Sequence, residues 1–226
     1  MQELKVIYED NHIIVVEKKP NIPSQLDKTG DIDMLTIVKD YIKEKYNKPG
    51  NVYLGLVHRL DRPVGGIMIF AKTSKAASRL SNQVREKIFK KEYLAVVDGK
   101  FEQVKGGLKD YLYKDERNNI SKVVNKEKKN AKLASLDYEV LKYNNVKNLS
   151  LVKINLHTGR HHQIRVQLAN FKHSIFGDQK YGTRGKGKQI ALWAYKLTII
   201  HPITKKEMEF TDFPDSVGTW CILKEI

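Results

Sequence analysis

Short apolar runs rich in valine and isoleucine recur along the chain and constrain its fold more than any other feature. They include "VIYEDNHIIVVEKKP", "GIMIFAK", "KKEYLAVVDGK", "NLSLVKINL" and "IALWAYKLTIIHP". Each run has the length of a β-strand or a strand pair, and several end at turn residues such as Pro20 or Gly99. None reaches the roughly 20 apolar residues that a membrane-spanning helix needs. The pattern predicts a β-rich mixed sheet.

Three segments show signs of helix. Residues 34–46 carry apolar side chains three and four positions apart behind Asp33, a suitable N-cap. A second helix is predicted after a cap at Thr73 or Ser74, and a third after a turn at Gly159. A few such helices suffice to cover a sheet. The fold class is therefore predicted as α+β, with a largely antiparallel sheet and flanking helices and loops.

Composition constrains the number of domains, the class of binding partner and the cellular compartment. With 226 residues and 41% hydrophobic residues, the chain suits a single domain over 1–226 that has room for two closely packed subdomains. The 41 Lys and Arg residues outnumber the 26 Asp and Glu residues, and a formal charge of +15 favours RNA, DNA or an anionic membrane surface as partner. A single cysteine and no leader-like start predict a cytoplasmic protein.

One carboxylate stands between two arginines in "LVHRLDRPVGGIMIFAKT". Asp61 follows Arg59 by two positions and directly precedes Arg62. Neighbouring positive charge favours the ionised form of a carboxyl group, so Asp61 is expected to be available as a nucleophile or a base. The simpler interpretation is an ordinary ion pair at a strand end.

Other polar residues gather in two further motifs. In "KKEYLAVV", Tyr93 and Lys91 are two positions apart on a predicted strand and therefore share a sheet face. "LHTGRHHQIRVQLA" places several cationic or neutral donors at a strand-to-helix junction, where free N–H groups also favour anions. Its histidines lack the HExxH pattern, a nearby carboxylate and a cysteine pair, so no metal site is predicted. The glycine-spaced basic segment 177–189 suits a phosphate backbone or is a solvated loop.

Taken together, these motifs resemble the RluA-type pseudouridine synthases. "HRLDRPVGGIMIFAKT", "KKEYLAVV", "LHTGRHHQIRVQLA", "FGDQKYG" and "LWAYKLTIIHP" follow one another in the order of that family, and the likeness covers about residues 8–213. The resemblance implies an enzyme that isomerises uridine to pseudouridine in ribosomal or transfer RNA without a cofactor. It also implies the pseudouridine synthase fold, with a central sheet around a basic cleft.

The resemblance also implies roles for individual residues. Asp61 matches the essential aspartate, Tyr93 the tyrosine that stacks on the target base, and Arg165 the arginine that pairs with the aspartate. Arg59 matches the arginine that fills the space left by the extruded nucleotide. The other residues predicted to bind substrate are His58, Arg62, Arg160, His162, Gln163 and Leu192.

Two departures from the family pattern bear on substrate preference. Pro63, Val64 and Gly65 replace the usual Thr and Ser before Gly66, and Trp193 stands in "LWA" where the family has "LHA". Neither change touches a residue assigned to chemistry. Because the chain begins directly with the catalytic motifs, no S4 RNA-binding module is expected.

Several alternatives remain open at this point. Asp61 has three candidate roles: addition to ribose C1′, addition to uracil C6, or proton removal from C2′. A catalytically silent RNA-binding or ribosome-assembly protein on the same fold is the second hypothesis, and a metal-dependent nuclease sensitive to EDTA is the third. Residues 105–130, expected to form exposed hairpins or mobile loops, and residues 179–189 are predicted to select the RNA. A monomer without membrane attachment is expected.

Overall fold

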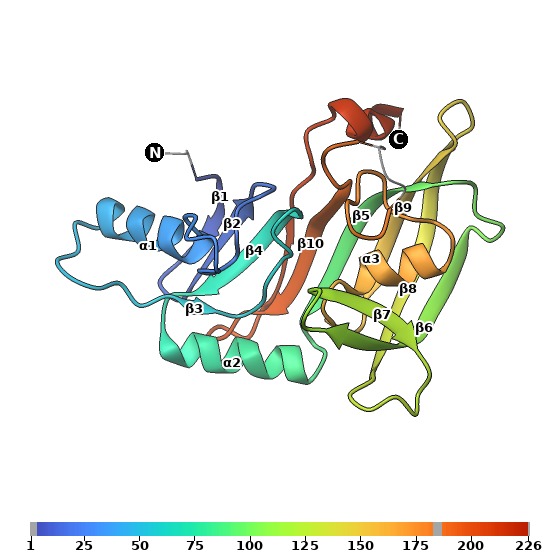
Figure 1. Cartoon of the computed structure of the whole chain (residues 1–226). Coiled ribbons are helices and arrows are strands. Elements are labelled where there is room, and N and C mark those ends of the chain that lie inside the picture. The colour runs from blue at the N-terminus through green and yellow to red at the C-terminus, as the bar shows by residue number, and fades with distance from the viewer. Residues whose placement is uncertain (1–3, 183–186, 226) are drawn as a thin grey trace. The chain divides into compact units, whose positions relative to one another are not determined.

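The computed structural model describes residues 4–182 and 187–225. The chain divides into two compact units, which are Met1–Lys90 with Ala194–Phe213 (unit 1) and Lys91–Trp193 with Pro214–Ile226 (unit 2). Figure 1 labels the helices and strands of both units. The predicted α+β class is confirmed, because sheets dominate each unit and three α-helices are described.

The sheet of unit 1 is built from the N-terminal strands and a late return of the chain. Strands β1 (Val6–Glu9), β2 (Ile13–Lys18) and β4 (Gly65–Ala71) lie in the order β1-β2-β4, and most of β10 (Leu192–Ile200) continues it. Two strands lie off this path: β3 (Gly55–Leu56) pairs antiparallel with β4, and β11 (Glu207–Thr211) with β10. The side chain of Asp10 accepts the N–H groups of His12 and Ile13, which closes the β1–β2 turn.

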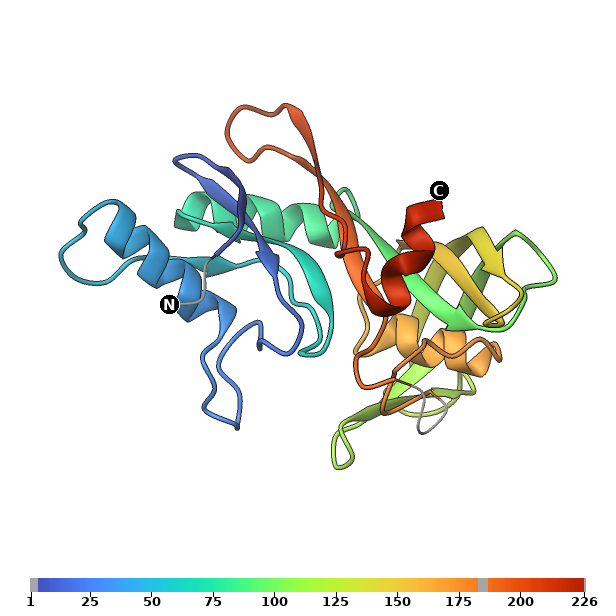
Figure 2. The same cartoon turned by 90° about the horizontal axis from the view of Figure 1, so that it is seen from above.

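Both predicted helices of unit 1 form. Helix α1 (Met34–Lys45) is capped by Asp33, whose side chain accepts the N–H of Thr36, and Thr73 caps α2 (Ser74–Arg85) through the N–H of Ala76. Helix α2 packs on one face of β2 and β4, in a core that holds Ile13, Val15, Ile67, Ile69, Ala76 and Leu80. Consecutive residues of β2 and β4 are fully buried, so both faces of these strands are covered (Figure 2).

Unit 2 contains an antiparallel sheet in the order β5-β9-β8-β6-β7. The strands are β5 (Lys90–Asp98), β6 (Lys105–Asp115), β7 (Ile120–Val124), β8 (Lys132–Asn144) and β9 (Leu149–Leu156). This sheet curves around helix α3 (Gln163–Asn170), as Figure 1 shows. Val166 of α3 joins a small core with Leu112 and Ala134. A 3-10 helix spans Gly218–Glu225.

The polar segment 105–130 is an ordered hairpin in this structure. Strands β6 and β7 pair from Tyr111 with Val124 to Asp115 with Ile120, so the expected hairpin is confirmed and the expected mobile loop is wrong. Leu112 at 4% exposure explains the difference, because apolar contacts on one face hold the hairpin against α3. Of the predicted loop 179–189, residues 183–186 lie outside the described residues.

Across residues 4–182 and 187–225, no helix combines the length and the apolar character that a membrane span requires.

Candidate functional site

The loop that carries Asp61 connects β3 to β4 within unit 1. The hydroxyl of Ser24 donates to the carbonyl of Leu60 at 2.8 Å and accepts the N–H of Leu60 at 3.1 Å. The carbonyl of Asp61 accepts the N–H of Val64 at 2.9 Å and closes a tight turn. Asn21 donates its N–H to the carbonyl of Arg62 at 2.8 Å. These bonds fix the backbone on both sides of the Asp61 carboxylate.

A buried lysine lies beneath this loop. Lys18, the last residue of β2, is fully buried, and its Nζ donates to the carbonyls of Val64 at 2.6 Å, Arg62 at 2.9 Å and Lys19 at 3.2 Å. Burial lowers the pKa of Lys18 to about 7, while the charge of Asp61 acts in the opposite direction. Lys18 therefore holds the turn and places a titrating cation near the candidate catalytic carboxylate. Sequence reasoning assigned it no role.

Because the pKa of Lys18 is lowered in the folded protein, the free energy of unfolding is expected to increase with pH. Between about pH 7 and 10.5 the unfolded chain binds more protons at this lysine than the folded protein does, so the free energy of unfolding rises with pH. From pH 7 to 9 the wild-type protein should gain about 2 kcal/mol more than Lys18→Met, measured by urea unfolding. Lys19→Met, at an exposed neighbouring position, should behave as wild type. An equal gain in Lys18→Met would contradict this assignment.

Three more predicted residues flank Asp61 in unit 1. Arg59 is exposed, as a residue that contacts RNA must be. Arg62 forms ion pairs with Asp31 and, at 3.7 Å, with Asp27, so its guanidinium secures the preceding loop. His58 is buried, and its Nε2 accepts the N–H of Ile69 at 3.1 Å. Substrate contacts by Arg62 and His58 stay predictions, and both side chains have structural partners.

The turn behind Asp61 contains Pro63, Val64 and Gly65 and is followed by a glycine in a conformation that other residues rarely adopt. Val64 is 2% exposed and packs into unit 1. Gly66 has a φ of +120°, and a Cβ at this position would lie 2.2 Å from the carbonyl oxygen of Ala194. No other residue fits this close approach of the two strands without backbone movement.

In unit 2, Tyr93 and Lys91 share a face of β5, as predicted. Tyr93 is 6% exposed and lies opposite Ile154 on β9. The Nζ of Lys91 lies 3.4 Å from where a Cβ on Gly159 would be, so this lysine reaches the turn of the "HTGRHHQIR" motif. Burial lowers the pKa of Lys91. Lys91 therefore approaches the motif from β5.

The motif turn is held by Gln163. Its Oε1 accepts the hydroxyl of Thr158 at 2.7 Å and the N–H of Arg160 at 3.0 Å, and its Nε2 donates to the carbonyl of Ser135 at 3.1 Å. Arg160 remains exposed, and its Nε donates to the carbonyl of Leu133 at 3.0 Å. Gln163 thus shapes the turn, and Arg160 presents a guanidinium at the surface of unit 2.

His162 adopts a left-handed conformation with a φ of 52° where α3 begins. It is buried, and its Nδ1 lies 2.8 Å from the hydroxyl of Tyr181. Burial and the charge of Arg165 lower the pKa of His162 to about 2. This ring is therefore neutral at physiological pH and joins the motif to the Tyr181 segment. His161 likewise has a partner, with Nδ1 at 3.0 Å from the hydroxyl of Ser121 on β7.

Arg165 makes a two-pronged ion pair with Asp178. Its Nε donates to Oδ2 at 2.7 Å and its Nη2 to Oδ1 at 2.6 Å, and both side chains are almost completely buried. Oδ1 of Asp178 also accepts the N–H groups of Lys180 and Tyr181. The ring of Tyr181 lies 5.3 Å from the guanidinium carbon. Asp178 belongs to the "FGDQKYG" motif, but sequence reasoning gave it no role. The pairing of Arg165 with Asp61 stays a prediction.

The remaining predicted residue, Leu192, is the first residue of β10 and is 4% exposed, in an apolar run with Ile190 and Ala191. Its apolar surroundings suit the predicted lining of a base pocket. In the described part of the chain, His, Cys, Asp and Glu side chains do not gather in groups of three that would suit a metal ion.

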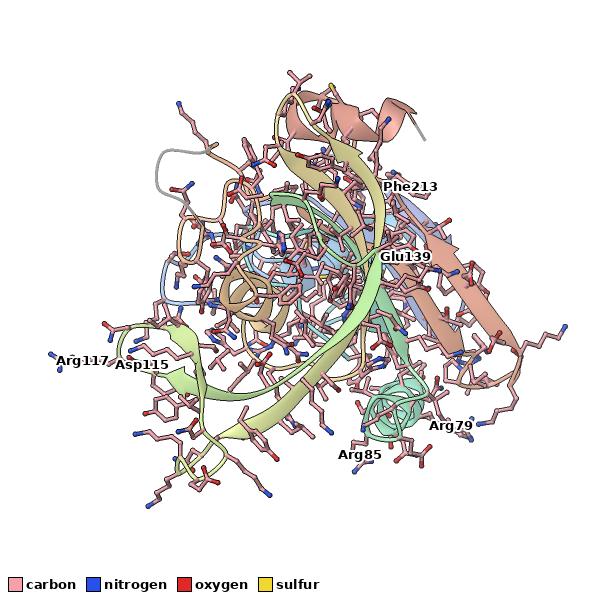
Figure 3. The ribbon with its side chains drawn as sticks, turned by 90° about the vertical axis from the view of Figure 1, so that its right-hand side faces the viewer. Arg79, Arg85, Asp115, Arg117, Glu139 and Phe213 are labelled. Carbon is pink, nitrogen blue, oxygen red and sulfur yellow. The ribbon has the colours of Figure 1, made fainter. Side chains whose placement is uncertain are left out.

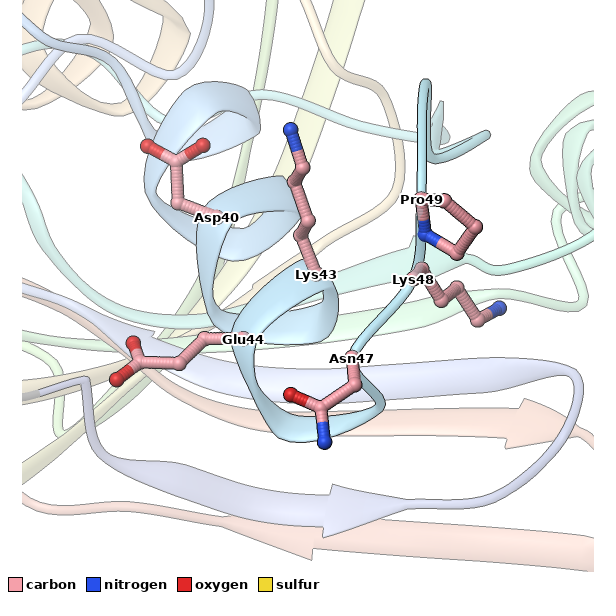
Figure 4. A pocket seen from close by; sticks show the side chains of 6 residues that line it. All are labelled: Asp40, Lys43, Glu44, Asn47, Lys48 and Pro49. Carbon is pink, nitrogen blue, oxygen red and sulfur yellow. The ribbon is translucent and has the colours of Figure 1, made fainter.

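A shallow surface hollow at the end of α1 lies outside these residues (Figure 4). Every residue that lines it is exposed, and its charges are mixed: Asp40, Lys43, Glu44, Asn47, Lys48 and Pro49. It lacks the aromatic and branched aliphatic side chains typical of a substrate site. The candidate functional residues are therefore the Asp61 loop, within unit 1, and the motif residues, within unit 2.

Comparisons with known proteins identify the family of the chain. A family model described as RNA pseudouridylate synthase matches residues 12–170. The uncharacterized RNA pseudouridine synthase YhcT of Bacillus subtilis is 33% identical over 205 residues, which cover 89% of this chain and 66% of the relative. The chain thus spans just under two thirds of that protein. The tRNA pseudouridine synthase C of Haemophilus influenzae is 30% identical over 230 residues, covering 92% of each chain.

A solved structure shows the same fold. Human RNA Pseudouridylate Synthase Domain Containing 1 superposes with a TM-score of 0.76 at 22% identity, covering 95% of this chain and 84% of that one. The family model spans the Asp61 loop, Tyr93 and Arg165, the three residues that sequence motifs single out. The chain therefore belongs to the RNA pseudouridylate synthase family, in its RluA-type branch, whose members are isomerases that convert uridine to pseudouridine in RNA.

Proposed function

We propose that this protein isomerises specific uridines in transfer or ribosomal RNA to pseudouridine, with Asp61 as the catalytic carboxylate acting on a flipped-out nucleotide. The observation that carries the proposal is the anchoring of the Asp61 turn. Ser24, Asn21 and Lys18 fix its backbone through hydrogen bonds of 2.6 to 3.1 Å. A reacting group held by rigid neighbours requires little reorganisation when substrate arrives.

The proposed reaction starts with extrusion of the target nucleotide, because a stacked base shields its glycosidic bond. Unstacking costs a few kcal/mol. Stacking of the free base on an aromatic ring returns about 1 to 3 kcal/mol, and Tyr93 is the ring assigned to this task. Arg59, exposed on the Asp61 loop, is assigned to the space that the base leaves. Lysines supply contacts to phosphates, in keeping with the formal charge of +15.

Isomerisation then breaks the bond from ribose C1′ to uracil N1 and forms a bond from C1′ to C5. The proton on C5 leaves and N1 gains one, so atoms and electrons balance without a cofactor. Attack at C1′, attack at C6 and proton removal from C2′ all use an ionised carboxylate at the position of Asp61. Arg165 is the cation proposed to support that charge, and Asp178 holds its guanidinium in one orientation.

The proposal also concerns which class of RNA is the substrate. The name of the Haemophilus influenzae relative says that it acts on tRNA, which makes transfer RNA the first substrate to test. Ribosomal RNA remains the second. A cytoplasmic location and a monomeric state stay predictions from the sequence.

Tritium release from C5-tritiated uridine tests the proposal directly. Unmodified transfer and ribosomal RNA transcripts are incubated with the protein, with and without EDTA. We expect release from at least one transcript, at equal rates in both conditions, and pseudouridine in the product by mass spectrometry. Binding of all transcripts with no release would favour the silent RNA-binding protein. Strand cleavage that EDTA abolishes would favour the nuclease.

A further inference from the structure

The outer face of strands β8, β6 and β7 carries features that the proposed chemistry does not use. The inner face of these strands packs on α3 through Leu112, Ala134 and Val123. Because side chains alternate along a strand, Lys109, Tyr111 and Tyr113 of β6 lie on the opposite face. Figure 3 views this side of the protein, with Asp115 and Arg117 at the turn between β6 and β7.

Two tyrosines are neighbours on this outer face. Tyr111 lies opposite Val124 of β7 and Leu133 of β8, and Tyr113 lies opposite Lys122 of β7. Both rings are partly exposed, and Leu133 is 37% exposed. Directly opposed side chains in an antiparallel pair are about 5 Å apart, so Val124, Tyr111 and Leu133 form an apolar row, and Tyr113 lies next to it opposite Lys122.

Positive charge surrounds the two rings. Residues 105–132 contain nine Lys and Arg residues against four Asp and Glu residues, a net charge of +5. The Nζ of Lys128 lies 5.4 Å from the centre of the Tyr113 ring. Three carboxylates of the outer face have a basic partner: Asp115 pairs with Lys122, Asp137 with His157, and Glu139 with Lys105 and Lys153. The surface around the tyrosines is therefore positive.

The surface also adjoins the "HTGRHHQIR" motif within unit 2. Arg160 of that motif donates its Nε to the carbonyl of Leu133, at the edge of β8. Leu133 faces Tyr111 across the β6–β8 pair. A row of neighbouring residues thus runs from a predicted substrate-binding arginine to the β6–β7 hairpin.

We propose that this outer face, here named the tyrosine platform (Lys109, Tyr111, Tyr113, Lys122, Lys128 and Leu133), binds a single-stranded segment of RNA outside the target nucleotide. Bases stack on the two rings and lysines contact phosphates, the combination by which proteins hold single strands. Protein interfaces are depleted in lysine, so the composition favours RNA over a protein partner. That the bound strand belongs to the substrate rests on the proposed function.

Equilibrium binding of fluorescein-labelled oligouridine tests the platform. Tyr111→Leu/Tyr113→Leu keeps an apolar cover on the sheet but removes both rings, and we expect binding at least about tenfold weaker. A short RNA duplex, whose bases are already stacked, should bind the variant as it binds wild type. Tyr143→Leu is the matched control, because Tyr143 lies on β8 with Lys100 Nζ 5.8 Å from its ring centre, outside the platform. Equal thermal unfolding of all variants excludes misfolding.

Salt dependence separates stacking from charge. Lys122→Gln/Lys128→Gln should reduce the slope of log affinity against log salt by about 0.7 for each phosphate that is no longer neutralised, whereas the tyrosine variant keeps the wild-type slope. Photocrosslinking with 5-iodouridine should attach RNA to Tyr111 or Tyr113. If the lysine variant weakens binding and the tyrosine variant does not, the platform is wrong and the hairpin acts by charge alone. If neither variant changes binding, the proposal is overturned.

Turnover distinguishes failure of this inference from failure of the proposed function. At saturating RNA, the tyrosine variant should release tritium at the wild-type rate and show only a raised KM. If wild type releases no tritium from any transcript, the proposed function fails, while the binding and crosslinking results still decide the platform.

Discussion

Asp61→Asn is expected to lower the rate of tritium release by at least about a thousandfold, while leaving RNA affinity and thermal stability close to wild type. Loss of a nucleophile or a general base in an enzyme commonly costs several orders of magnitude in kcat. Asparagine matches aspartate in size, and the backbone of the turn is held by Ser24 and Lys18 through bonds that do not involve the carboxylate. The turn should therefore survive the substitution while the charge is removed.

The matched control is Asp40→Asn, which removes an exposed carboxylate of α1 in the same unit. This variant should retain the wild-type rate. Rates are measured at saturating RNA, and affinity is measured separately by filter binding, so that a binding defect is not mistaken for a chemical one. Retention of more than about a tenth of the wild-type rate by Asp61→Asn would remove Asp61 from the chemistry.

Local sequence patterns were sufficient to predict most of the helices and strands. Asp33 and Thr73 cap their helices as predicted, because an N-cap depends on a few consecutive residues. The strand predictions for β2, β4, β5 and β9 hold for the same reason, since side-chain alternation and β-branching are local signals. The exception is the segment 105–130, where polar residues obscured the buried face of β6.

Contacts between distant residues could not be predicted in this way. Lys18 is 46 positions from Val64, and in a strand with apolar residues on both faces nothing marks one lysine as buried. Asp178 belongs to a recognisable motif, but its position 13 residues after Arg165 does not reveal a two-pronged pair. Lys18 positions the turn of Asp61, and Asp178 positions the guanidinium of Arg165. Both contacts are known only from the three-dimensional structure.

Asp178→Ala is expected to destabilise the protein by about 3 to 5 kcal/mol, because it leaves the buried Arg165 guanidinium without this carboxylate. Urea unfolding measures the change. Glu139→Gln is the matched control, since it breaks ion pairs of unit 2 with Lys105 and Lys153 that are more open to water, and it should cost far less than Asp178→Ala. An Asp178→Ala cost no larger than that of the control would show that the pair contributes little to folding.

Replacement of both partners separates stability from catalysis. Arg165→Met/Asp178→Leu exchanges a buried ion pair for apolar side chains, a change that is often neutral for the free energy of unfolding. We therefore expect this double variant to recover most of the stability that Asp178→Ala removes. If Arg165 supports the charge of Asp61 during the reaction, tritium release should nevertheless stay at least about a hundredfold below wild type, since removal of one electrostatic interaction from a transition state costs that much. Recovery of stability and turnover together would assign Arg165 and Asp178 to folding alone.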